Sequence, residues 1–249
     1  MPHREPPKII LYIQPGFELP GHPRCLSGTP FAIKVARTLA YKGLDFELEE
    51  VGWAERAERL PQISAARKLP VLEYNGERIE DSTDIAYFLD ARHPSPPLLP
   101  ADPELRARCH FVEDWADEVL YWYGIYEQRR ISPSSEGSEA YFADFPEPLR
   151  QAAAQRLGEE VEKNLDRQGV GRYPVDKVKA DTRRGLDALV TYLENAPYIA
   201  GPALSLADLA VFGQFRRRLA GTNPWLEGEI RARPTLGTWY ERVDAATRR

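Results

Sequence analysis

Two expected helix starts carry hydroxyl and carboxyl side chains that could bind an anion. Thr29 precedes Pro30, and Asp81 precedes Ser82. The free backbone N–H groups at a helix start attract anions, and a neighbouring hydroxyl adds another donor. The same residue types are the usual N-caps of helices, so an ordinary capping role is the alternative at each position.

The sulfur and imidazole side chains do not form a metal-binding pattern. The chain has two cysteines, Cys25 and Cys109, and four scattered histidines. The cysteines form neither a Cys-x-x-Cys pair nor a zinc spacing, so we expect no metal. Two unpaired thiols without a disulfide framework are typical of a cytoplasmic protein.

Two further groups of side chains have a structural interpretation and a functional one. Five aromatic residues cluster in one expected helix, at positions 115, 121, 122, 123 and 126. Aromatic residues at such a spacing usually pack into a core. The run Arg216-Arg217-Arg218 is expected to be a solvated face or a partner contact rather than a nucleic-acid site.

The elements that must position these residues change in character near residue 93. Before it, short apolar runs alternate with amphipathic stretches in the order β-α-β-(α)-β-β-α, and Asn75-Gly76 predicts a tight hairpin. After it, nearly all of the chain has a helical pattern. Five prolines between His93 and Pro103 indicate a linker. We therefore expect an α+β domain over residues 8–92, a linker over 93–103 and an all-helical domain over 104–249.

Composition and charge exclude several classes of protein. The 249 residues are 43% hydrophobic and 29% charged, as in a soluble globular protein. Residues 1–92 carry 12 basic and 14 acidic side chains, and the remainder carries 21 and 24, so nucleic acid is not an expected partner. No apolar run approaches the roughly 20 residues of a membrane-spanning helix. The first seven residues lack the apolar core of a signal peptide, which supports a cytoplasmic location.

Three groups of motifs, in the expected order, resemble the glutathione transferase superfamily over nearly the whole chain. The most specific group is Lys68-Leu69-Pro70-Val71-Leu72, Asn75-Gly76 and Glu80-Asp81-Ser82-Thr83-Asp84-Ile85. The others are Thr29-Pro30-Phe31 with Lys34-Val35, and Tyr198-Ile199-Ala200-Gly201 with Ser205-Leu206-Ala207-Asp208. The resemblance implies a thioredoxin-like first domain (βαβαββα), an all-α second domain, glutathione as cosubstrate and a homodimer.

The resemblance also implies which residues bind glutathione. Asp81 and Ser82 occupy the place where the γ-glutamyl group binds, with Asp81 facing either its carboxylate or its ammonium group. Pro70 is implied to be cis, and the backbone of Leu69 to pair with the cysteinyl amide, as an added strand would. Arg67 and Lys68 could pair with the glycyl carboxylate, or could be a solvated basic pair.

Thr29 occupies the position of the family's catalytic serine or cysteine. A thiol with a pKa near 8.5 is only about 3% ionised at pH 7, and lowering that pKa by two units takes about 2.7 kcal/mol. A hydrogen bond from a hydroxyl to a charged sulfur contributes roughly 1.5–3 kcal/mol, and a helix start adds about 0.3–1 kcal/mol. Thr29 could therefore activate the thiol without a general base.

Cys25 is the alternative to Thr29, because it could form a mixed disulfide with glutathione and support reductase chemistry. Ser27 and Tyr12 are further hydroxyl candidates, although Tyr12 is expected in the core. In the family, the first helix of the second domain lines the pocket for the electrophile. We expect Trp115 and Trp122 of that helix to be divided between core and pocket.

One segment departs from the family pattern. The family usually passes from the first strand to the first helix in a few residues, whereas here residues 14–28 intervene. A longer loop is similar to that of the metaxin and failed-axon-connections relatives. The leading hypothesis is a glutathione transferase that activates the thiol of glutathione for attack on a small hydrophobic electrophile. The alternatives are a non-catalytic scaffold of the same fold and a glutathione-dependent thiol reductase using Cys25.

Overall fold

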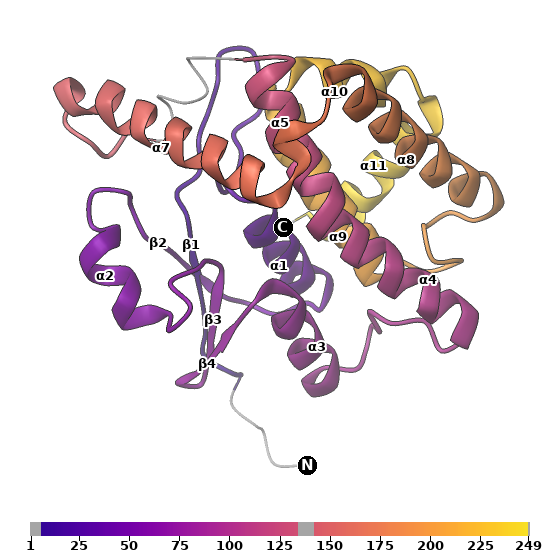
Figure 1. Cartoon of the computed structure of the whole chain (residues 1–249). Coiled ribbons are helices and arrows are strands. Elements are labelled where there is room, and N and C mark those ends of the chain that lie inside the picture. Colours follow the sequence, from indigo (N-terminus) through magenta and orange to yellow (C-terminus); the bar gives the residue numbers. More distant parts are fainter. Residues whose placement is uncertain (1–5, 134–141, 249) are drawn as a thin grey trace.

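A four-stranded mixed sheet forms the first part of the chain (Figure 1). The computed structural model describes residues 6–133 and 142–248. The strands are β1 (Ile9–Ile13), β2 (Glu47–Glu50), β3 (Val71–Tyr74) and β4 (Glu77–Glu80), in the order β2-β1-β3-β4. β1 is parallel to β2 and antiparallel to β3, and β3 is antiparallel to β4. Asn75 and Gly76 have φ angles of 51° and 87°, which confirms the predicted tight hairpin.

Helices cover both faces of this sheet. α1 (Pro30–Tyr41) and α3 (Ser82–Arg92) lie on one face, where Leu11 packs into a cluster with Val35 and Ile85. α2 (Arg56–Ile63) lies on the other face, against Tyr12 and Val71. Successive residues of β1 therefore serve opposite cores, because side chains alternate along a strand. This order of elements is the predicted thioredoxin-like arrangement.

The rest of the described chain is helical and lies beside the sheet (Figure 1). Its elements are α4 (Pro103–Asp114), the π-helical η1 (Trp115–Leu120), α5 (Tyr121–Arg130), α7 (Glu147–Gln168), the 3₁₀-helical η2 (Val170–Arg172), α8 (Val175–Asn195), α9 (Leu206–Arg217), the π-helical η3 (Arg218–Thr222), α10 (Pro224–Arg231) and α11 (Pro234–Thr247). α4, η1 and α5 run on without a break, as the expected long helix 104–130. Within the described ranges, none of the helices has the length and apolar character needed to cross a membrane.

The long connection between β1 and α1 is part of the main core. Phe17 and Cys25 pair through backbone hydrogen bonds of 3.2 and 2.9 Å. Phe17, Leu19 and Cys25 then pack into the same buried cluster as Phe212 of α9 and Trp239 of α11. The connection therefore joins the sheet to the helical part by apolar packing.

The arginine run at the end of α9 corrects one expectation. Arg216 is half-buried, but Arg217 and Arg218 are buried. Arg217 donates to the Gly28 carbonyl at 2.8 Å, and Arg218 donates to the carbonyls of Gln214 and Tyr121. The expectation of a solvated face was wrong for these two residues, because acceptors on distant segments satisfy their guanidinium groups.

A close approach between α9 and α1 gives a first prediction. A Cβ atom at Gly213 would lie 2.6 Å from the Pro30 carbonyl oxygen, which is backbone and cannot rotate away. We expect Gly213→Ala to lower the free energy of unfolding by about 1–3 kcal/mol, as for overpacked cores. Urea denaturation measures this change. Gly237→Ala, whose Cβ meets nothing within 4 Å, is the matched control and should be neutral or stabilising. Equal effects in both variants would contradict the prediction.

Candidate functional site

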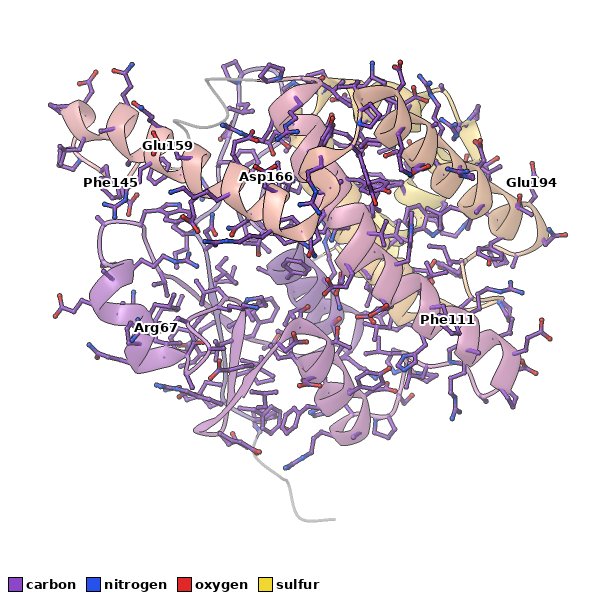
Figure 2. All side chains as sticks on the ribbon, in the orientation of Figure 1. Arg67, Phe111, Phe145, Glu159, Asp166 and Glu194 are labelled. Atoms are coloured by element: carbon purple, nitrogen blue, oxygen red, sulfur yellow. The ribbon has the colours of Figure 1, made fainter. Side chains whose placement is uncertain are left out.

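A cavity of about 710 Å³ lies between the start of α3, the segment that precedes β3, and α4. We call it the α3 cavity. Its walls include Lys68, Leu69, Pro70, Asp81 and Ser82, which the sequence singled out, together with Phe31, Glu80, Thr83, Asp84, His110, Phe111, Glu113, Asp114, Asp117 and Glu118. In Figure 2, Phe111 lies on α4 and Arg67 lies in the turn between α2 and β3. The structure therefore brings five of the six predicted glutathione-binding residues to one cavity.

Asp81, immediately before α3, has a strained backbone conformation. Its φ angle is 68°, in the left-handed region that carboxamide and carboxyl residues tolerate better than most. One carboxylate oxygen accepts hydrogen bonds from the backbone N–H groups of Thr83 at 2.8 Å and Asp84 at 3.4 Å. Asp81 is therefore the N-cap of α3, and its other carboxylate oxygen takes no part in the capping bonds. Within the described residues, the N–H and hydroxyl groups of Ser82 make no hydrogen bond.

The Leu69–Pro70 bond is cis, as the resemblance implied. The backbone N–H and carbonyl groups of Leu69 form no hydrogen bond within the described part of the chain. Leu69 thus presents an unpaired donor and an unpaired acceptor immediately before the buried Pro70. Arg67 is exposed and lies outside the α3 cavity, whereas its neighbour Lys68 lines it.

Glu80 is a positioning residue that the sequence analysis did not single out. Its carboxylate accepts from the Ser64 hydroxyl at 2.7 Å and from the backbone of Ala65 and Ala66 at 2.8 and 3.0 Å. The Ser64 hydroxyl in turn accepts from the Lys68 N–H at 3.0 Å. These bonds fix the turn that carries Lys68, and they lower the pKa of Glu80, with the Ser64 bond as the largest cause.

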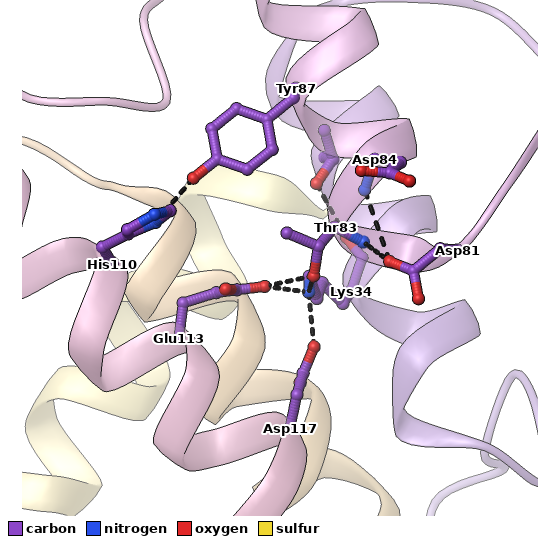
Figure 3. Close-up of polar contacts among 9 residues, drawn as sticks. Lys34, Asp81, Thr83, Asp84, Tyr87, His110, Glu113 and Asp117 are labelled. Atoms are coloured by element: carbon purple, nitrogen blue, oxygen red, sulfur yellow. Dashed lines mark hydrogen bonds and ion pairs between the residues drawn. The ribbon is translucent and has the colours of Figure 1, made fainter.

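A buried ion-pair network forms the floor of the α3 cavity (Figure 3). The Lys34 ammonium group, 1% exposed, pairs with Glu113 and, at 2.6 Å, with Asp117. The hydroxyl of Thr83 accepts from Lys34 at 3.0 Å and donates to Glu113 at 2.6 Å. Burial raises the pKa of Asp117 to about 6, although the charge of Lys34 opposes that shift. In the described residues, no group of acidic, histidine or cysteine side chains could hold a metal ion.

Thr29 lies at a second, smaller cavity of about 180 Å³. We call it the α7 cavity, because Leu157 and Val161 of α7 line it, together with Trp53 and Gln14. The Thr29 hydroxyl accepts from the Ala32 N–H at 3.3 Å and caps α1, which leaves its proton available to a ligand. Phe31 lines the α3 cavity and Tyr121 lines the α7 cavity, and the centroids of their two rings lie 4.9 Å apart.

The other candidate nucleophile and hydroxyl groups, those of Cys25, Ser27 and Tyr12, lie in the protein interior. Cys25 is fully buried and donates to the Ser27 carbonyl at 3.3 Å, and burial raises the pKa of its thiol. The position disfavours the reductase alternative, which requires an accessible thiolate. Ser27 is buried and donates to the Gln14 carbonyl at 2.7 Å. Tyr12 packs beneath α2 in the core.

The two predicted pocket tryptophans line neither of these cavities. Trp115 packs against the main core beside Gly185 of α8, and Trp122 packs against the cluster that contains Tyr126 and Leu165. Tyr121, between them in sequence, is the aromatic residue of this helix that reaches the α7 cavity. The η1 π-helix immediately before Tyr121 changes which side chains face inward, and sequence periodicity does not reveal such a change.

Comparisons with known sequences agree on one family. Residues 26–97 match the family model "Glutathione S-transferase, N-terminal domain". The chain is 24% identical over 222 residues to an isoprene-epoxide–glutathione S-transferase of Rhodococcus sp. (strain AD45), covering 86% of this chain and 91% of the relative. It is 32% identical over 123 residues to glutathione S-transferase U19 of Arabidopsis thaliana, a match that covers 48% of this chain and 54% of the relative. The match to this plant relative thus spans about half of its length.

Solved structures share the fold over nearly the whole chain. The beta-etherase LigF from Sphingobium sp. strain SYK-6 aligns with a TM-score of 0.67 at 20% identity, over 96% of this chain and 95% of that one. A glutathione S-transferase from Methylobacterium radiotolerans, in complex with glutathione sulfonate, aligns with a TM-score of 0.60 at 23% identity, over 96% and 91%. The metaxin-like character of the 14–28 loop stays a prediction. Residues 26–97 thus match the N-terminal domain of glutathione S-transferases, and the chain as a whole shares the fold of solved glutathione S-transferases.

Proposed function

We propose that the protein is a glutathione transferase that binds glutathione in the α3 cavity and activates its thiol beside Thr29. In this proposal, residues 8–92 are the glutathione-binding domain, 93–103 the linker and 104–249 the helical domain. The observation that carries the proposal is the set of unpaired backbone and hydroxyl groups of Leu69 and Ser82 beside one cavity. Unpaired donors and acceptors at such a place are available to a peptide-like ligand.

The two ends of glutathione need different partners, and the α3 cavity offers both. The N–H and hydroxyl of Ser82, at the start of α3, suit the γ-glutamyl carboxylate. The ammonium group needs a carboxylate, which Asp81 supplies. Asp117 also lines the cavity, and its buried Oδ1 has no hydrogen-bond partner in the described residues. Lys68 is placed for the glycyl carboxylate, while Arg67 lies farther out.

The thiol then lies between the two cavities, near Phe31 and Tyr121. The Thr29 hydroxyl donates to the thiolate, while its oxygen keeps its capping bond to Ala32. The sulfur attacks an electrophilic carbon in the α7 cavity. A carbon–sulfur bond forms, and the electron pair of the broken bond passes to the leaving group or to the epoxide oxygen. The thiol loses its proton to solvent, and an epoxide oxygen takes one up from solvent. Ile125, Leu157 and Val161 give the α7 cavity apolar walls and its volume is small, which favours a small apolar electrophile. The name of the Rhodococcus relative, an isoprene-epoxide transferase, supports the same class.

Titration calorimetry with glutathione, comparing wild type and Asp81→Ala, tests this proposal. The variant should bind about tenfold or more weakly, because a hydrogen bond to a charged group contributes roughly 1.5–3 kcal/mol. Asp102→Ala is the matched control, since Asp102 caps α4 in the same way, accepting from Glu104 and Leu105, and does not line the α3 cavity.

Binding that is weakened equally in both variants would show that only the loss of a helix cap matters. A wild-type protein that does not bind millimolar glutathione would contradict the transferase proposal. The non-catalytic scaffold would then remain. The homodimer and the cytoplasmic location, which the family resemblance and the composition led us to expect, stay predictions.

A further inference from the structure

Arg217, at the end of α9, lines the α7 cavity together with Thr29. It is only 6% exposed, although it belongs to a run of three arginines. An arginine keeps its positive charge at every physiological pH, because its pKa exceeds about 12. The fold therefore brings a permanent positive charge to the wall of the cavity that also contains the proposed thiol activator.

Hydrogen bonds to two other segments hold the guanidinium group of Arg217 in place. Its Nε donates to the Gly28 carbonyl oxygen at 2.8 Å, and Gly28 immediately precedes Thr29. Its Nη1 and Nη2 both donate to the side-chain oxygen of Gln128 at 3.2 Å. These two acceptors are neutral groups, so they orient the charge without cancelling it. A charge that is already oriented needs no rearrangement to stabilise a neighbouring anion.

The turn that carries Thr29 is fixed from the sheet side as well. The Ser27 hydroxyl donates to the Gln14 carbonyl at 2.7 Å, and it accepts from the Thr29 N–H at 3.3 Å. Arg217 adds the bond to Gly28 from the helical part of the chain. The fold therefore sets the position of the guanidinium group relative to Thr29.

The charge of Arg217 acts on acidic groups at and near the cavity. Burial raises the pKa of the Tyr121 hydroxyl, and the charge of Arg217 opposes that rise. Burial also raises the pKa of the Cys25 thiol, and Arg217 opposes that rise too. In the proposed function the thiol of glutathione lies near Tyr121, so it is exposed to the same charge. An opposite charge within about 4–6 Å favours the ionised form of an acid.

We propose that the charge of Arg217 stabilises the thiolate of bound glutathione, while its bonds to Gly28 and Gln128 hold that charge beside the Thr29 turn. The inference rests on the proposed function and adds an electrostatic contribution to the hydrogen bond from Thr29. Thr29 is the group that contacts the sulfur, and Arg217 is a positioning residue that supports it from α9.

Ultraviolet absorbance of the bound thiolate against pH tests the proposal. Arg217→Gln should raise the thiol pKa by about one unit, the lower end of the effect of a nearby opposite charge. The glutamine Nε2 follows the same number of bonds as the arginine Nε, so it can still donate to Gly28. Arg217→Lys keeps the charge, and its thiol pKa should stay close to that of wild type.

Arg129→Gln is the matched control for Arg217→Gln. Arg129 lines the same cavity, but its Nε lies 3.5 Å from the carboxylate of Glu162, which balances its charge. The thiol pKa in this variant should equal that of wild type. The comparison removes the same kind of side chain from the same cavity and differs in the charge that is lost.

Gln128→Glu tests the charge with Arg217 still in place. The new carboxylate can accept from the same two guanidinium nitrogens and balances their charge. The thiol pKa should again rise by about one unit, although the bond to Gly28 is kept. A purely structural role of Arg217 predicts no change here, so this variant decides the question even where Arg217→Gln does not fold.

Kinetics and ligand binding separate the expected effect from structural damage. In Arg217→Gln, kcat/KM should fall about tenfold near neutral pH and recover above the thiol pKa of the variant, because one pKa unit is a tenfold change in thiolate. S-methylglutathione, which has no ionisable thiol, should bind every variant with wild-type affinity, since neither Arg217 nor Gln128 lines the α3 cavity.

A folded Arg217→Gln protein with the thiol pKa of wild type would overturn the proposal. An equal rise of that pKa in Arg217→Lys or in Arg129→Gln would overturn it too, because the effect would then not follow the charge. The same holds for a deficit in kcat/KM of equal size at every pH. Failure of the wild-type protein to bind S-methylglutathione would contradict the proposed function itself, and this inference with it.

Discussion

Thr29→Ala lowers kcat/KM for glutathione conjugation by about 10–100-fold if the hydroxyl of Thr29 stabilises the thiolate. This range corresponds to the roughly 1.5–3 kcal/mol of a hydrogen bond to a charged group. The pKa of the bound glutathione thiol should rise by about one to two units in the variant, since one unit equals 1.36 kcal/mol. Ultraviolet absorbance of the thiolate against pH measures that change, and steady-state kinetics measure kcat/KM.

Thr29→Ser is the matched control, because serine keeps both the donor and the helix cap. It should retain most of the activity and the low thiol pKa. Thr29→Ala also removes the capping bond to Ala32, which costs about 1 kcal/mol of stability, so its unfolding curve must be measured separately. A folded Thr29→Ala protein with an unchanged thiol pKa would contradict the catalytic role. The N–H groups of the α1 start would then be the remaining activators.

Lys34→Met destabilises the protein by about 3–5 kcal/mol, since it leaves two buried carboxylates without their counter-ion. Both Glu113 and Asp117 contact the Lys34 ammonium group, and Glu113 is almost fully buried. Urea denaturation of the variant and wild type measures the loss. The control is Lys177→Met, because Lys177 pairs with Asp181 at 2.6 Å on the surface, where such a pair contributes at most about 1 kcal/mol.

The loss of stability in Lys34→Met should increase as the pH rises. Asp117 already has a pKa of about 6, above the ordinary value near 3.8, so its contribution to stability is lost as the pH rises through about 6. Without Lys34, whose charge lowers it, the pKa of Asp117 rises further, and the variant loses more stability as the pH rises from 5 to 8. The triple variant Lys34→Met, Glu113→Gln, Asp117→Asn should recover most of the stability. If Lys34→Met lost the same free energy of unfolding relative to wild type at pH 5 and at pH 8, this explanation would be contradicted.

Features that depend on neighbours in sequence were predictable from the sequence. The Asn75-Gly76 turn, the Thr29 cap and the Ser205–Asp208 capping box are all present. Each is decided by a few adjacent residues, because turn geometry and capping are local. The cis form of Pro70 came only from the family resemblance, since local chemistry does not favour it.

Features that depend on distant segments were not predictable in the same way. Arg218 is buried because the carbonyls of Leu120 and Tyr121, about a hundred positions earlier, accept its N–H groups. Lys34 is buried because two carboxylates of α4 and η1 meet it. A run of charged residues normally indicates a solvent-exposed segment. Only the packed fold shows which of the charged side chains have buried partners.

The candidate site was predictable in its polar half and not in its apolar half. Leu69, Asp81 and Ser82 meet at the α3 cavity as expected from their motif. Trp115 and Trp122 line neither the α3 nor the α7 cavity, and the π-helical η1 between them changes the helical phase in a way that sequence periodicity does not reveal. Glu80 was overlooked as a positioning residue, since its partners are the backbone groups of a preceding turn.

The β1–α1 connection has a consequence for how the molecule unfolds. Its residues Phe17, Leu19 and Cys25 belong to the same apolar cluster as α9 and α11, and its Gly28 carbonyl accepts from Arg217. The sheet therefore cannot separate from the helices without exposing that cluster to water. Amide hydrogens of Leu11 in β1 and Phe212 in α9 should exchange at the same slow rate, through one cooperative opening. The two halves of the chain are thus a single thermodynamic unit, although each has its own secondary structure.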